Sequence, residues 1–138
     1  MARTKHRKGA LAALGGFVAM PFNVLDSRAY LSLGPSGVKL LMDVCRQYTG
    51  ANNGRLTPSM GMMKDRGWTS PDTLNRAKKE LRESRLITVT KQGSRRKGDC
   101  EFWALNWHKL DWRDDMDIQP GGHDYMGFLR LEDAKTKP

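Results

Sequence analysis

The most informative part of the sequence is a run of hydroxyl, amide and basic side chains between positions 69 and 82. If residues 71–84 form a helix, the apolar residues share one face and these polar side chains point elsewhere. Hydroxyls at a helix start suit a phosphate, Asn pairs with adenine, Arg pairs with guanine, and further cations suit a phosphate backbone. The candidates for such contacts are Thr69, Ser70, Thr73, Asn75, Arg76, Lys79 and Arg82. The alternative is a solvated polar helix face.

A second basic group lies between two predicted strands, residues 86–91 and 100–106, which are rich in β-branched and aromatic side chains. Its members are Lys91, Arg95, Arg96 and Lys97. Like charges at a hairpin tip repel one another, and a phosphate backbone or a minor groove would relieve that repulsion. The alternative is a sheet edge protected from aggregation by charge.

Motifs of catalysis and metal binding are absent from the sequence. It contains no HExxH, GxSxG, P-loop or GxGxxG pattern. The histidines and the aspartates of the C-terminal part lack metal-ligand spacing; they are His6, His108, His123, Asp111, Asp114, Asp115 and Asp117. Cys45 and Cys100 stand alone, which argues against a disulfide framework or a zinc site. We therefore expect no enzyme activity, no metal and no cofactor.

The charge balance indicates a polyanionic partner. The chain has 138 residues, enough for about one domain, and a net charge of +9. Residues 1–108 hold 19 basic and 8 acidic side chains, whereas residues 109–138 hold 5 basic and 7 acidic ones. Nucleic acid is the simplest partner for the basic part. No run of 18 apolar residues occurs, so we expect no membrane span.

The elements that would position the basic groups follow from capping and periodicity. A helix is predicted over 35–48, with a buried stripe of Val38, Leu41, Met42, Cys45 and Tyr48. Thr57-Pro58 predicts the start of a short helix to about 65, and Ser70-Pro71 the start of a helix to 84 with Leu74, Ala77 and Leu81 inward. Two short helices around a Gly-containing turn, followed by a hairpin, predict a mainly α fold with a small β-hairpin (α+β), a winged helix-turn-helix.

Three regions follow from this interpretation. Residues 1–14 form a basic flexible arm, which either follows a DNA groove or only solubilises the terminus. Residues 15–107 form the winged-helix domain. Residues 108–138 form a partly ordered extension for docking or dimerisation. The basic start and the apolar run 10–20 also resemble a secretory signal, but Gly15 and Gly16 interrupt that run. We expect a cytoplasmic protein.

The sequence also resembles a known group of proteins. The segments concerned are GFVAMP at 16–21, LDSRAY at 25–30, QYTGANNG at 47–54, GWTS at 67–70, LNRA at 74–77 and LI at 86–87. Together they look like small winged-helix proteins of phages and mobile elements, similar to the N-terminal DNA-binding domains of phage and plasmid replication proteins. The resemblance covers about residues 15–107. The usual Gly before the strand is replaced by Ser84-Arg85.

Two functions are compatible with these features. The first is double-stranded DNA binding through a recognition helix (about 71–84) and a basic wing (about 91–99), in replication or transcription regulation of a phage or mobile element. The second is a winged-helix scaffold that binds protein, such as a phage-encoded inhibitor of a host complex. In the second, the aromatic C-terminal segment would be the interaction surface; in the first, it would form a homodimer interface.

Overall fold

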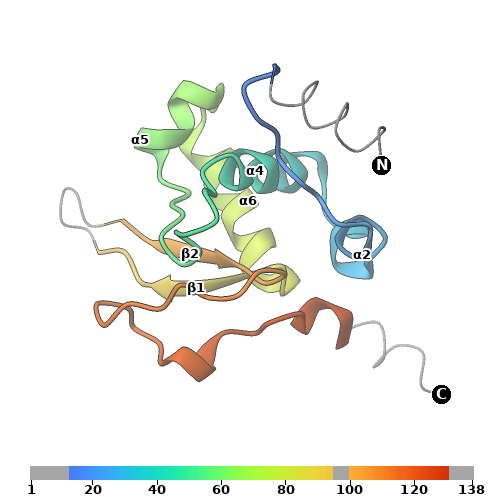
Figure 1. The fold of residues 1–138 in the computed structure, drawn as a ribbon. Coiled ribbons are helices and arrows are strands. Elements are labelled where there is room, and N and C mark those ends of the chain that lie inside the picture. The colour runs from blue at the N-terminus through green and yellow to red at the C-terminus, as the bar shows by residue number, and fades with distance from the viewer. Residues whose placement is uncertain (1–12, 95–99, 131–138) are drawn as a thin grey trace.

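Two helices and a two-stranded antiparallel sheet form the body of the protein (Figure 1). The computed structural model describes residues 13–94 and 100–130. Its elements are α2 (Phe22–Leu25), α3 (Arg28–Leu31), α4 (Pro35–Cys45), α5 (Met60–Met63), the 3-10 helix η1 (Lys64–Arg66), α6 (Pro71–Ser84), β1 (Ile87–Lys91), β2 (Phe102–Leu105) and the 3-10 helix η2 (Pro120–Gly122). The α+β class is confirmed.

Helix α6 begins and ends where the sequence predicts. The Ser70 hydroxyl accepts a hydrogen bond from the Thr73 N–H at 3.2 Å, and Pro71 occupies the first helical position. Leu74, Ala77 and Leu81 are buried, as predicted. The helix ends at Arg85, which takes the left-handed conformation (φ 67°) that glycine usually supplies. The turn into β1 therefore forms without the expected glycine.

Helix α4 ends at Cys45, three residues before its predicted end, and part of its predicted buried stripe is wrong. Leu41 and Cys45 are buried, but Met42 is 39% exposed, and Leu40 and Val44 are buried in addition. Apolar residues surround most of this helix, so spacing alone does not select the buried face. The packing of α6 against it selects that face.

The predicted start of the short helix at Thr57-Pro58 is also wrong. The N-cap is Ser59, whose hydroxyl accepts from the Met62 N–H at 3.3 Å. Thr57 and Pro58 lie before the helix, which starts at Met60. The Thr57 backbone instead pairs with the Gln47 side chain, donating to Oε1 at 2.9 Å and accepting from Nε2 at 2.7 Å.

The sheet places the hairpin next to the helices. In the β1–β2 register Ile87 faces Leu105 and Val89 faces Trp103, with an irregularity between Val89 and Lys91. Both strands are shorter than predicted, because β1 starts at Ile87 and β2 covers only Phe102–Leu105. Leu56 adds an isolated antiparallel bridge to Trp103 on the other edge of β2.

Residues beyond 107 pack against the same core. They return beneath β1 in Figure 1, where the Asp117 N–H donates to the Thr90 carbonyl at 2.8 Å. The Met126 N–H donates to the Asn106 carbonyl at 2.6 Å, and Phe128 is fully buried in the main hydrophobic cluster. No helix within residues 13–94 and 100–130 is long and apolar enough to cross a membrane.

Candidate nucleic-acid interface

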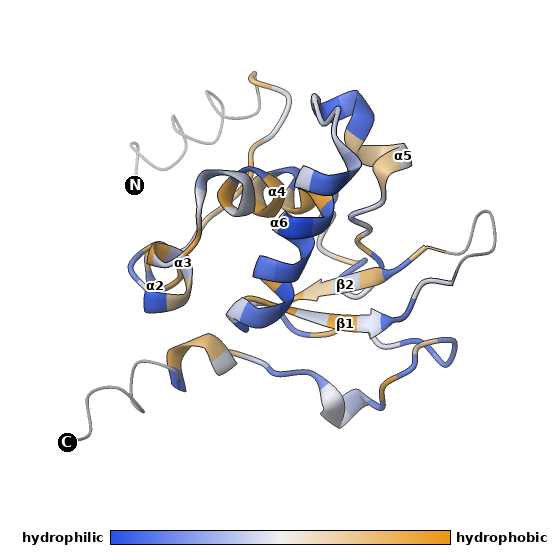
Figure 2. Cartoon of the chain, turned by 180° about the vertical axis from the view of Figure 1, so that it is seen from behind, coloured by the Kyte–Doolittle hydropathy of each residue, from blue (hydrophilic) through white to orange (hydrophobic). Residues whose placement is uncertain are grey.

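The outer face of α6 exposes the central candidates of the sequence analysis. Figure 2 shows α6 in front of the sheet, with much of its ribbon in the colour of hydrophilic residues. Asn75, Arg76 and Lys79 are exposed, and none has a hydrogen-bond or ion-pair partner within the part of the chain that the structure describes. Asp72 and Glu83 lie four residues from Arg76 and Lys79, a spacing that permits ion pairs, yet neither pair forms. This face therefore presents cations and an amide that are available to a ligand.

The hydroxyl candidates at the start of α6 have different surroundings. Thr69 is exposed, whereas Ser70 and Thr73 are half-buried. The Ser70 hydroxyl and the Thr73 N–H bind each other in the N-cap, so the cap itself uses part of the donor set predicted for a phosphate. Thr69 is the most accessible hydroxyl of the three.

Arg82 is held by a carboxylate from the hairpin. Its Nε and Nη2 donate to Glu101 at 2.9 and 2.6 Å, and the Trp103 Nε1 donates to the same carboxylate at 2.7 Å. Burial raises the pKa of Glu101, but the hydrogen bonds from Arg82 and Trp103 outweigh it and lower the pKa below its usual value. Burial lowers the pKa of Lys78 nearby. Arg82 thus joins α6 to the hairpin, and a phosphate contact from it would have to open this pair.

The base of the hairpin is described, but its tip is not. Lys91 is half-buried at the end of β1, opposite Phe102. The next residue, Gln92, donates its N–H to the Asp117 carboxylate at 2.7 Å, which anchors the base of the hairpin. Arg95, Arg96 and Lys97 lie outside the described residues.

A buried aspartate that the sequence analysis missed fixes the turn before α6. Asp43, 6% exposed, accepts hydrogen bonds from Lys39 Nζ at 2.8 Å, from Trp68 Nε1 at 2.8 Å and from Arg66 Nε at 3.2 Å. Burial raises the pKa of Asp43, but the three donors together lower it by more than burial raises it. The pKa of Asp43 is therefore below its usual value. The spacing of Lys39 and Asp43 could have indicated their pair, but nothing in the sequence connects Asp43 with Trp68.

Two more cations flank the start of α6. Lys64 and Arg66 of η1 are exposed and directly precede the turn at Gly67. They were not among the predicted contacts, because this segment was predicted only as a short helix. Arg66 pairs with Asp43, so Lys64 is the one of these two residues that adds a cation without an ion-pair partner, among the described residues, beside the start of α6.

The acidic C-terminal segment neutralises cations elsewhere. Asp115 pairs with Arg55 at 3.0 Å, and Asp124 pairs with Arg85 at 3.2 Å and also with Arg130. Arg55 and Arg85 therefore do not contribute a free charge to the basic surface. On α6 and η1, the exposed cations without an ion-pair partner among the described residues are Lys64, Arg76 and Lys79, whereas Arg66 of η1 pairs with Asp43 at 3.2 Å.

Comparison of the chain with known protein families, with curated proteins and with solved structures found no match. Within residues 13–94 and 100–130, no group of three or more His, Cys, Asp or Glu side chains is placed to hold a metal ion. The functional interpretation therefore depends on the geometry and charge of the residues described above.

Proposed function

We propose that this protein binds double-stranded DNA through a winged helix-turn-helix. The order of elements supports it: α4, a bridge at Leu56, the pair α5–η1, then α6, β1 and β2. In this proposal α6 is the recognition helix and the β1–β2 hairpin is the wing. The observation that supports it most is the exposed face of α6, where Asn75, Arg76 and Lys79 lack partners within the described chain.

The proposed docking puts α6 in the major groove. A major groove accepts one helix, and a recognition helix contacts bases mainly from its N-terminal part. Asn75 and Arg76 lie in that part and would contact base edges, while Lys79 and Thr69 would contact phosphates. Lys64 would contact the backbone on the side of η1, and the wing residues would contact it on the other side, whereas Arg66 is held by Asp43.

The resemblance of the sequence to winged-helix proteins of phages and mobile elements suggests in which biological process the DNA binding would act. We propose replication or transcription regulation of such an element, in the cytoplasm of a bacterial cell. The excess of 19 basic over 8 acidic side chains in residues 1–108 agrees with a nucleic-acid partner.

A salt titration of duplex binding tests the proposed function. We expect the logarithm of the binding constant to fall linearly with the logarithm of the salt concentration, with a slope of about −0.9 per phosphate neutralised. Replacing Arg95, Arg96 and Lys97 with alanine should shallow the slope by about 2–3. The matched control is Arg55→Ala together with Arg85→Ala, since their partners are Asp115 and Asp124. Absence of duplex binding by the wild-type protein at low salt would refute the proposal.

Arg76→Ala tests base recognition by α6. Because a bidentate Arg–guanine pair contributes about 1–3 kcal/mol of discrimination, we expect a loss of that size on the preferred site and relaxed preference at one base pair. The preferred site comes from selection out of a random duplex pool. Lys79→Ala should instead weaken binding to all duplexes alike. An equal loss on preferred and random DNA for Arg76→Ala would make Arg76 a phosphate contact.

A second candidate function is binding of a protein partner. Large apolar side chains are exposed away from α6: Phe22 is 80% exposed, Leu31 70% and Tyr125 49%. Exposed apolar patches often mark interaction surfaces. Sedimentation of the wild-type protein and of Phe22→Ser/Leu31→Ser tests it. If the wild-type protein self-associates and the variant does not, the result supports a homodimer through these side chains. If both proteins are monomers, the homodimer is excluded and DNA remains the proposed partner.

A further inference from the structure

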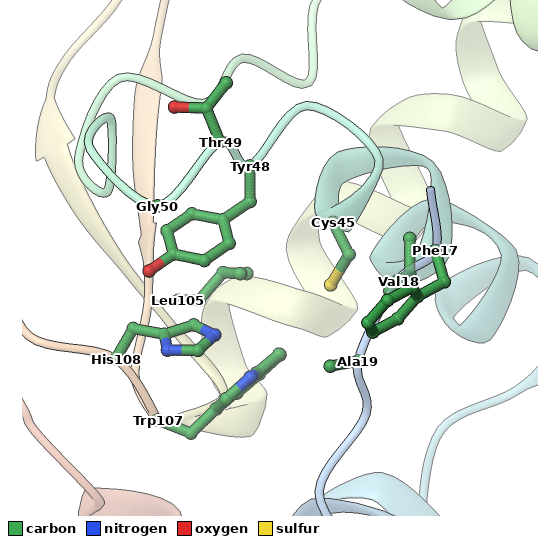
Figure 3. Close-up of a pocket in the computed structure, with 10 residues that line it drawn as sticks. All are labelled: Phe17, Val18, Ala19, Cys45, Tyr48, Thr49, Gly50, Leu105, Trp107 and His108. Carbon is green, nitrogen blue, oxygen red and sulfur yellow. The ribbon is translucent and has the colours of Figure 1, made fainter. Parts of the chain in front are cut away.

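A cavity of about 220 Å³ lies beside the C-terminal end of α4. Its walls come from three places: the extended segment Phe17–Ala19, the end of α4 with the following turn, and the chain that leaves β2 (Figure 3). In Figure 1 the extended segment crosses in front of α4 while α6 lies behind it, and Figure 2 shows the reverse. None of the residues proposed to contact DNA lines this cavity.

Four of the ten residues that line the cavity are aromatic, and none of the ten is acidic or a lysine or arginine. The Tyr48 and His108 rings stack at 4.3 Å between centroids with an angle of 18°, and the Trp107 ring lies 6.0 Å from His108. The Cys45 thiol points into the space between them, and burial raises its pKa to about 12, so it remains neutral. Burial also lowers the pKa of His108, which favours the neutral ring. Flat, neutral walls of this kind suit a planar aromatic ring.

The volume of the cavity is large enough for a small ring system. An engineered protein cavity of about 150 Å³ holds benzene, so a space of 220 Å³ accepts one or two fused rings. Phe17 forms the outer wall and is 67% exposed, so a bound ring would cover apolar surface that the fold leaves in water. The indole nitrogen of Trp107 is buried and has no acceptor among the described residues.

A neighbouring hollow favours a ligand with a negative charge, because Arg46 lines it. It has a volume of about 320 Å³ and shares Phe17, Val18, Cys45 and Tyr48 with the aromatic cavity. Arg46 lines it, and no acidic side chain lines either space. Arg46 is exposed and its guanidinium has no ion-pair partner in the described ranges. A carboxylate attached to the ring would therefore meet the Arg46 cation, while the negative charge that acts on this site is that of Asp111 beside Tyr48 and His108.

We propose that this protein binds a small planar aromatic carboxylate, with the ring between Phe17, Trp107 and the Tyr48–His108 stack and the carboxylate on Arg46. This proposal is independent of DNA binding, because the two sets of residues do not overlap. It assigns a ligand site to the C-terminal end of α4.

Titration with matched acids and amides tests the proposal. The probes are benzoate and indole-3-carboxylate, each beside its neutral carboxamide, and the readouts are calorimetry and the ¹⁵N-labelled indole resonances. Trp107→Phe assigns the Trp107 resonance. We expect at least one acid to bind and to shift the Trp107 resonance while Trp112, outside the cavity, is unchanged. Each acid should bind about fivefold more tightly than its amide.

Two variants separate the ring from the charge. Arg46→Gln should weaken the acid about fivefold and leave the amide unchanged, with Arg113→Gln as the matched control. Phe17→Ala should weaken acid and amide alike, by about three- to tenfold, because it removes one aromatic wall. Both changes are at exposed positions. No binding of any of the four probes up to about 1 mM, or equal binding of acid and amide, would overturn the proposal.

Discussion

Asn53→Ala is expected to lower the free energy of unfolding by about 3–4 kcal/mol, one of the largest single-residue losses in this protein. Asn53 is fully buried, and its side-chain oxygen accepts from the Leu105 N–H at 2.7 Å. Its Nδ2 donates to the carbonyls of Leu105, His108 and Lys109 at 3.0, 3.2 and 3.0 Å. Alanine would leave a buried N–H and buried carbonyls without partners, which costs more than the lost bonds themselves.

Chemical denaturation measures this loss, and the neighbouring asparagine is the matched control. The side chain of Asn52 binds only nearby backbone, at Thr49 and Gln47. We expect Asn52→Ala to cost about 1 kcal/mol. The thermal midpoint of Asn53→Ala should fall by about 10 °C. If the two variants were equally stable, the anchoring role of Asn53 would be wrong.

Asp43→Ala is expected to destabilise the protein by about 2–3 kcal/mol and to loosen the turn before α6. The change leaves the indole N–H of the buried Trp68 without its acceptor, while Lys39 and Arg66, each with 48% of the side chain exposed, can return to water. Solvation of these two cations keeps the loss below that of a fully buried ion pair.

The contribution of Asp43 should also depend on pH. Its folded-state pKa is lowered, so its stabilisation is present above the unfolded pKa of about 3.9 and is lost as the pH falls through the folded value. The stability difference between wild type and Asp43→Ala should therefore be constant near neutral pH and shrink on acidification below about pH 4. Denaturant titrations of both proteins at several pH values measure it. A difference that stayed constant into strong acid would contradict the ionised role of Asp43.

Local signals in the sequence predicted the helices and strands best where capping was unambiguous. Ser70-Pro71 is a hydroxyl cap before a proline, and both ends of α6 agree with the prediction. The same pattern at Thr57-Pro58 failed: Leu56 pairs with Trp103, the Thr57 backbone pairs with the Gln47 side chain, and Ser59 caps the helix instead. The two motifs look alike locally, and they differ in contacts between residues far apart in the sequence, which a local pattern does not contain.

The candidate interface was predictable to a similar degree. The exposed positions of Asn75, Arg76 and Lys79 follow from the 3.6-residue period of α6 and are observed. The engagement of Arg82 by Glu101 was not predictable, because it joins a helix to the residue before β2 across 19 residues of sequence. The positions of Lys64 and Arg66 beside the start of α6 were not predictable either, because the turn at Gly67 places them there.

The sequence alone determined the class of the fold, the two ends of α6, its buried face, and the concentration of positive charge in residues 1–108, since these follow from local capping, periodicity and composition. The tertiary structure alone decided which cations remain available. Asp115 and Asp124 pair with Arg55 and Arg85, and Glu101 holds Arg82, whereas Arg76 and Lys79 have no such partner within the described residues. Ion pairs between distant segments depend on which side chains the folded backbone brings within a few ångströms, and sequence spacing does not contain that information.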